Sequence, residues 1–165
     1  MDKNRDIFIS ILDNHKGVIF KIVNSYCKDV TDKQDLIQEI IIQLWISFEK
    51  YNNQFKLSTW IYRIALNTSI SFYRKNKVRK EKTVISSAIL QKTLKADEPF
   101  QENPNLLKLQ GFIQELRELD KALILLYLDG LSQKEISKII GIKPTNVGTK
   151  IERIKKTLKQ KFKNQ

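Results

Sequence analysis

The sequence is poor in cysteine, histidine, glycine and proline, and each shortage excludes a class of protein. With Cys27 as its one cysteine the chain cannot form an internal disulfide, and with His15 as its one histidine it lacks the common zinc ligand sets. Five glycines and three prolines in 165 residues are too few for a turn-rich all-β fold. These shortages favour a helical protein, for which we expect no metal and no cofactor.

Long apolar segments are missing as well. The longest stretch without a charged residue, Ile64 to Tyr73, has ten residues, whereas a membrane span needs about 20. The N-terminus has acidic residues among its basic ones and no small-residue cleavage site, unlike a secretory signal. We therefore expect a cytoplasmic protein that does not insert into a membrane.

What the sequence does have is an excess of basic residues, with 30 lysines and arginines against 18 aspartates and glutamates and a net charge of +12. The excess is concentrated, because residues 74–82 carry net +5 and residues 143–165 carry net +7. Two basic segments far apart in the sequence predict two contacts with a polyanion, and nucleic acid is the first candidate. The alternative is an ordinary solvated surface rich in lysine.

Apolar residues recur at helical spacing along most of the chain, which predicts an all-α fold of two small helical domains. We expect the first domain at residues 1–76, a flexible linker where the periodicity weakens at residues 77–103, and the second domain at residues 104–165. Helices in the first domain are expected at about residues 6–27, 31–49 and 59–75. Thr31 with Gln34 fits a capping box for the second of these helices, and Ser58 can cap the third.

The strongest local pattern covers residues 130–156. Ser132 with Glu135 fits a capping box that opens a short helix, Gly141 takes a tight turn, and a longer basic helix follows. This order is typical of a helix-turn-helix. If the longer helix buries its apolar stripe, its opposite face carries side chains that can meet base edges and phosphates in a major groove: Thr145, Asn146, Thr149, Glu152, Arg153 and Lys156, with Lys150 at the edge. The alternative is a helical bundle whose last helix simply has a solvated face.

A polar stripe and a group of aromatic side chains lie close together in the first domain. The stripe has members spaced by three or four residues, namely Arg63, Asn67, Ser71 and Arg74. The aromatic residues around it are Tyr51, Phe55, Trp60, Phe72 and Tyr73. Aromatic rings among basic residues suit unstacked bases of single-stranded nucleic acid. The alternative is that the rings pack in a core.

Three blocks of the sequence resemble regions 2 and 4 of the sigma-70 family of initiation factors. They are DLIQEIIIQLW, STWIYRIALNTSISFYRK and LSQKEISKIIGIKPTNVGTKIERIKKTL. Their order, and a linker without an intervening folded domain, resemble the small extracytoplasmic-function sigma factors. The resemblance covers nearly the whole chain, and three blocks in the correct order are more specific than any one of them.

The resemblance implies a sigma factor without enzymatic activity, which binds core RNA polymerase, directs it to a two-part promoter and helps to open the duplex. Its first domain would be a region 2 bundle that docks on the polymerase clamp coiled coil through Asp35, Leu36, Gln38 and Glu39. The same domain would bind and melt the downstream (−10) promoter element by capturing a flipped base. The residues for that step would be Phe55, Arg63, Asn67 and Arg74, while Trp60 would hold the third helix in place.

The second domain would be the region 4 helix-turn-helix, which contacts the polymerase flap and reads the upstream (−35) element. The residues that read it would be Asn146, Thr149, Lys150 and Arg153. The promoter DNA would thus be bound both as duplex and as single strand. An anti-sigma factor is a common partner in the family, although no residue here identifies one.

The chain departs from the family pattern at two positions. Ser71 stands where relatives often carry aspartate. Gly148 stands where many carry lysine, and glycine in place of that lysine would remove a phosphate contact. Three other functions are alternatives to the sigma-factor interpretation. They are a stand-alone helix-turn-helix regulator of duplex operator DNA, an enzyme acting on nucleic acid, and an interaction protein that only binds polymerase. The enzyme would need an assembled catalytic or metal site, and the sequence offers none.

Overall fold

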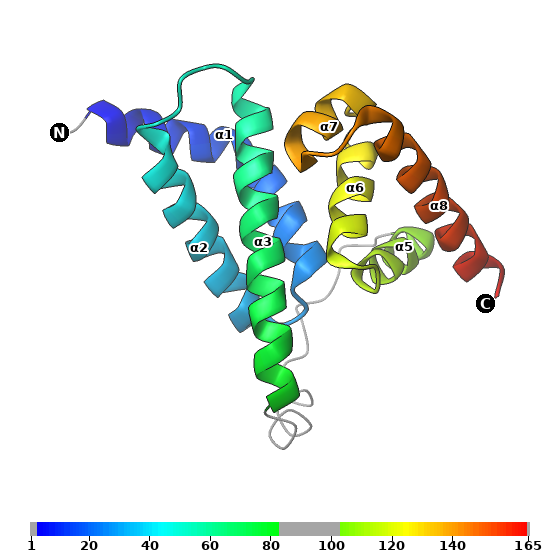
Figure 1. Ribbon diagram of the computed structural model, residues 1–165. Coiled ribbons are helices and arrows are strands. Elements are labelled where there is room, and N and C mark those ends of the chain that lie inside the picture. The colour runs from blue at the N-terminus through cyan, green and yellow to red at the C-terminus, as the bar shows by residue number, and fades with distance from the viewer. Residues whose placement is uncertain (1–2, 83–102, 165) are drawn as a thin grey trace.

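The computed structural model describes residues 3–82 and 103–164, and these residues form seven helices and no strand. The helices are α1 (Lys3–Tyr26), α2 (Val30–Phe48), α3 (Leu57–Lys82), α5 (Pro104–Gln114), α6 (Glu118–Leu128), α7 (Gln133–Ile140) and α8 (Pro144–Lys163). Figure 1 shows α1 to α3 gathered on one side and α5 to α8 on the other, with α6 and α7 beside α3. The predicted all-α class is confirmed. In the described part of the chain no helix is long and apolar enough to cross a membrane.

The first group is a three-helix bundle held together by an aliphatic core. Leu36, Ile40 and Leu44 recur every fourth residue along α2 and are buried against α1 and α3. Burying an aliphatic side chain of this size contributes about 1.5–3 kcal/mol. Ile22 of α1 and Leu66 of α3 belong to the same core. The bundle therefore gains its stability mainly from these three packed stripes.

Two helix starts in the first bundle differ from those expected from the sequence. The N-cap of α2 is Asp29, whose carboxylate accepts a hydrogen bond from the Asp32 backbone N–H at 2.9 Å, so the capping box at Thr31 is wrong. A carboxylate caps well because it also favours the helix dipole. Helix α3 begins at Leu57, which places Ser58 inside its first turn instead of at the cap.

Helix α3 is also longer than expected, because it continues past residue 75 to Lys82. Residues 77–82 of the expected linker are therefore helical, and the rest of it, residues 83–102, lies outside the described residues. The basic side chains along the end of α3, such as Arg74, Lys75 and Lys77, are exposed. The helix thus carries the first basic segment away from the bundle (Figure 1).

The second group encloses α6, of which residues 121–126 are all buried. Helix α5 is capped by Asn103, whose side chain accepts a hydrogen bond from the Asn105 N–H at 3.0 Å, and Pro104 lies in its first turn. Helix α6 begins at Glu118 and has no side-chain cap. Gly130, with φ of +78°, takes the left-handed conformation that follows the end of α6.

Helices α7 and α8 form the predicted helix-turn-helix. The capping box is present, since the Ser132 hydroxyl accepts from the Glu135 N–H at 3.2 Å and the Glu135 carboxylate accepts from the Ser132 N–H at 2.9 Å. Gly141, with φ of +82°, makes the turn. The Ser137 hydroxyl donates to the carbonyl of Ile142 at 2.6 Å and so ties α7 to the turn.

Candidate nucleic-acid interface

Helix α8 buries one stripe and exposes the opposite one. Val147, Ile151, Ile154 and Leu158 are buried, as the spacing predicted. Phe162, one turn beyond Leu158, is exposed and meets Phe112 edge to face at 5.0 Å between ring centroids. The exposed face carries Thr145, Asn146, Thr149, Glu152, Arg153 and Lys156, while Lys150 is half-buried at the edge. The face expected to meet DNA is therefore exposed to solvent.

The exposed face of α8 has local interactions that orient its side chains. The Arg153 guanidinium Nη2 lies 3.3 Å from Asp120 Oδ1, and the Arg153 side chain remains 63% exposed. Such an exposed ion pair contributes at most about 1 kcal/mol, so Arg153 can exchange Asp120 for a phosphate at little cost. The Thr149 hydroxyl donates to the Thr145 carbonyl at 3.1 Å, which keeps it on the helix surface.

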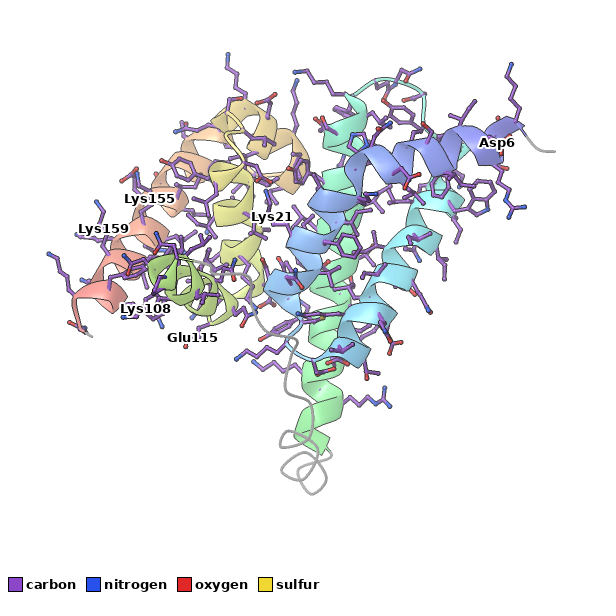
Figure 2. The ribbon with its side chains drawn as sticks, turned by 180° about the vertical axis from the view of Figure 1, so that it is seen from behind. Asp6, Lys21, Lys108, Glu115, Lys155 and Lys159 are labelled. Carbon is purple, nitrogen blue, oxygen red and sulfur yellow. The ribbon has the colours of Figure 1, made fainter. Side chains whose placement is uncertain are left out.

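A shallow hollow of about 520 Å³ runs along the outer side of α8. Its lining residues are four basic and one acidic, namely Glu152, Arg153, Lys155, Lys156 and Lys159. Figure 2 shows Lys155 and Lys159 on this outer side. Lys155 donates to Glu152 at 2.8 Å, and that bond raises the pKa of the Lys155 ammonium, which stays charged at neutral pH. Basic side chains gathered in this way on one side of a helix attract a polyanion.

Helix α3 presents the predicted polar stripe to solvent. Arg63, Asn67, Ser71 and Arg74 are all exposed. The Arg63 guanidinium lies 5.9 Å from the centroid of the Phe55 ring, which is 38% exposed in the loop before α3. The Tyr51 hydroxyl donates to the Phe55 carbonyl at 2.8 Å and so fixes this loop. An exposed ring beside a guanidinium offers both a stacking surface and a charge to a nucleotide.

Trp60 has a structural position at the start of α3. Its ring lies 5.0 Å from that of Tyr51 and 6.4 Å from that of Phe48, measured between centroids. These contacts connect α3 to the end of α2 and to the following loop. The expectation that Trp60 holds the third helix in place is thereby confirmed.

Helix α2 exposes three of the four residues expected to meet polymerase. Asp35, Gln38 and Glu39 are exposed, whereas Leu36 is 0% exposed and lies in the core of the bundle. The prediction that Leu36 touches a partner is therefore wrong. Apolar residues occur on nearly every side of α2, so periodicity did not separate the inner ones from the outer ones. The exposed apolar residues of α2 are Val30, Ile42, Trp45 and Ile46.

The two helical groups contact each other through polar side chains of α6 and its C-terminal turn. Asp129 accepts a hydrogen bond from the Tyr62 hydroxyl at 2.6 Å and pairs with the Lys21 ammonium. Figure 2 shows Lys21 on α1 at the junction with α6. Glu118 binds Arg74, whose Nε lies 2.9 Å from Glu118 Oε1, and this bond holds the pKa of the Glu118 carboxyl below its usual range. Arg74 is thus engaged within the protein.

A buried lysine that the sequence analysis missed completes this contact. Lys121 of α6 is 1% exposed, and its ammonium lies 5.3 Å from the Tyr26 ring centroid and 4.6 Å from that of Tyr73. Burial lowers the pKa of Lys121. The two ring faces stabilise the cation, which would otherwise be costly to bury. The signal in the sequence was a lysine directly before the apolar run from Ala122 to Leu126.

Tyr26 and Tyr62 predict a response to alkaline pH. Burial, assisted by Glu118, raises the pKa of Tyr26, and burial together with the hydrogen bond to Asp129 raises the pKa of Tyr62. A phenol whose pKa is raised by folding stabilises the fold below its unfolded pKa of about 10 and loses that contribution as pH rises further. Tyrosinate absorbance should therefore keep rising well above pH 10. Tyr26→Phe and Tyr62→Phe should each reduce this late rise, and an unchanged titration curve would contradict the assignment.

Within residues 3–82 and 103–164, no cluster of histidine, cysteine and acidic residues is placed to hold a metal ion. His15 is half-buried, and its Nδ1–H donates to the Ile11 carbonyl at 2.9 Å within α1.

Comparison with known proteins places both groups of helices in one family. Residues 11–79 match Sigma-70 region 2, and residues 106–158 match Sigma-70, region 4. The chain is 29% identical to the ECF RNA polymerase sigma factor SigW of Bacillus subtilis (strain 168), over 98% of this chain and 91% of SigW. It is 30% identical to the RNA polymerase sigma factor YlaC of the same organism, over 96% of this chain and 93% of YlaC.

The fold is similar to that of a solved sigma factor. The sigma factor RpoE, in its co-crystal structure with the anti-sigma factor NepR from Bartonella quintana, superposes with a TM-score of 0.72 at 18% identity. The match covers 94% of this chain and 96% of RpoE. At this identity the likeness concerns the fold alone.

Proposed function

The chain belongs to the extracytoplasmic-function group of the sigma-70 family of RNA polymerase sigma factors. From this premise we propose which of its surfaces bind polymerase, the −10 element and the −35 element. As a sigma factor it binds core RNA polymerase, directs it to specific promoters and promotes DNA melting for transcription initiation. A stand-alone regulator is not favoured, because the first domain matches region 2 and is not an unrelated sensor.

The first domain, residues 1–76, docks on the polymerase clamp coiled coil through Asp35, Gln38 and Glu39 of α2. This assignment is supported by the exposure of all three side chains on one helix whose buried face is occupied by the core. Leu36 has a positioning role from inside the bundle and does not contact polymerase. The second domain, residues 104–165, contacts the flap, and the connection between the two domains begins after α3 ends at Lys82.

The −10 element is bound and melted by Phe55, Arg63, Asn67 and Arg74. The observation that carries this proposal is the exposed stripe on α3 next to the Phe55 ring, because it leaves polar, cationic and stacking groups free for an unstacked base. Capture of a flipped base offsets the few kcal/mol that unstacking costs. Arg74 joins this surface once its ion pair with Glu118 opens, which costs at most about 1 kcal/mol for an exposed pair.

The −35 element is read as duplex by Asn146, Thr149, Lys150 and Arg153 of α8. Each domain alone binds weakly, and the two become effective together when both are held on the polymerase surface. We therefore expect poor specific DNA binding by the free protein and phosphate contacts that weaken with salt. The chain acts without enzymatic activity of its own and in the cytoplasm. An anti-sigma factor fits as a partner, since RpoE was solved with one.

The decisive experiment is reconstitution with polymerase. The purified chain is mixed with sigma-free core enzyme and a promoter library, and the transcripts are sequenced. Initiation at a shared two-part sequence supports the proposal. A chain that never co-purifies with core enzyme at low salt, or that binds a palindromic operator tightly without it, would overturn it.

Asn67→Ala tests the melting surface. We expect it to reduce opening of duplex promoters roughly 5- to 100-fold, because a lost base contact is worth about 1–3 kcal/mol, while core-polymerase binding stays unchanged. Opening is measured by permanganate reactivity of unpaired thymines, and activity should recover on promoters with a pre-melted −10 segment. Asn14→Ala on the exposed face of α1 serves as the matched control. Equal losses of opening and of polymerase binding would contradict the role of Asn67.

A further inference from the structure

A glycine lies one turn inside α8, where helix propensity disfavours it. Gly148 costs the helix about 0.5–1 kcal/mol relative to alanine. Its backbone is helical and does not take the left-handed conformation that Gly130 and Gly141 adopt. Conformational freedom therefore does not explain why the residue is glycine.

The space around Gly148 supplies the explanation. A Cβ atom at this position would lie 2.8 Å from Nε2, 3.2 Å from Cδ and 3.3 Å from Oε1 of Gln133. All three atoms belong to the terminal amide of one side chain. The amide of Gln133 therefore lies directly on the bare backbone of α8, in the volume that any side chain at position 148 would take.

The location of this amide connects it with the DNA-facing surface. Gln133 is exposed at the first position of α7, directly after Ser132, and the capping box holds that turn in place. On α8 the neighbours of Gly148 at three residues before and four after are Thr145 and Glu152, both exposed on the face assigned to the −35 element. The amide thus lies at the rim of that face.

We propose that Gln133 is a further specificity-determining residue, which reads a base edge of the −35 element in place of the side chain missing at position 148. An amide offers one donor and one acceptor side by side, and this pair matches adenine N6 and N7 in the major groove. Gly148 acts as a positioning residue, because only its lack of a side chain lets α7 contribute to the surface of α8. This inference rests on the proposed reading of duplex DNA by α8.

Two substitutions, one at Gln133 and one at Gly148, test whether the Gln133 amide reads a base. Gln133→Ala removes the amide, and Gly148→Ala displaces it with one methyl group. Displacement is tolerated because the contacted atoms are the end of a flexible side chain. In a transcription assay with core polymerase and promoters randomised across the −35 element, each variant should lose preference at the same base pair by roughly 5- to 100-fold. The double variant should be no worse than either single one.

The unfolding temperature distinguishes a role of Gly148 in promoter preference from a role in the stability of the fold. Gly148→Ala should unfold at the same temperature as wild type or higher, because alanine favours the helix. Gly111→Ala is the matched control, since Gly111 lies within α5 with no atom near its absent side chain. It should gain the same stability and leave promoter preference unchanged.

The outcomes distinguish the inference from the proposed function. If wild type and Gly111→Ala select a −35 sequence and the two variants select it equally well, the role of Gln133 is wrong while the sigma-factor function stands. A loss that is uniform over all −35 sequences would also refute base reading by Gln133. If wild type shows no −35 preference, both the inference and the assignment of α8 fail.

Discussion

Arg153→Glu should reduce initiation at a −35-dependent promoter on the order of 100-fold, because it removes a contact worth about 1–3 kcal/mol and places a negative charge against the phosphates. Arg153 lies on the exposed face of α8 and pairs with Asp120 of the same domain. Loss of the pair costs at most about 1 kcal/mol because Arg153 is 63% exposed, and repulsion between the new carboxylate and Asp120, which is 16% exposed, adds to that cost. The free energy of unfolding is measured in parallel, and the domain should remain folded. The loss of activity would therefore report on DNA binding.

The control for Arg153→Glu is the same charge reversal at Lys163, which is exposed at the C-terminal end of α8. Run-off transcription with core polymerase measures activity, and co-purification measures polymerase binding. Lys163→Glu should weaken initiation only slightly through the overall charge. Equal losses in the two variants would mean that α8 attracts DNA by net charge alone and does not read it.

Leu36→Ala should lower the free energy of unfolding by about 2–5 kcal/mol, because it opens a cavity in the first bundle. The Leu36 side chain is 0% exposed, whereas Ile42 on the outer side of the same helix is 50% exposed. Ile42→Ala should change stability by no more than about 0.5 kcal/mol and serves as the control. Chemical denaturation followed by circular dichroism measures both.

Glu39→Lys completes this test of α2. It should leave the stability of the bundle near that of wild type, because Glu39 is exposed and accepts a hydrogen bond from Gln43 of the same helix, at 3.0 Å. Binding to core polymerase should fall sharply, since the charge facing the clamp is reversed. If Leu36→Ala kept full stability and lost polymerase binding, α2 would have to pack with a different face inward.

The position of Arg74 illustrates how the domain contact alters a site that the sequence describes well. The stripe from Arg63 to Arg74 was expected from spacing alone, and all its members are exposed. Yet Arg74 is paired with Glu118, a residue of the other domain. No pattern within α3 could indicate this partner, because it lies 44 positions away in the sequence.

The sequence alone determined the all-α class, the helix-turn-helix and the exposed face of α8. These features depend on interactions within about four residues, such as the Ser132–Glu135 capping box and the buried stripe from Val147 to Leu158. Residue spacing and capping residues therefore suffice to predict such interactions. The family followed from the same local blocks.

The tertiary structure decided which of several apolar residues of α2 faces inward, how Lys121 is accommodated, and why Gly148 is a glycine. Each answer depends on a side chain from another element: the core around Leu36, the rings of Tyr26 and Tyr73, and the amide of Gln133. The partners of Asp129 are 67 and 108 positions away. Local sequence encodes the face that a helix turns away from water, but only the packing of whole helices determines which distant side chain meets it.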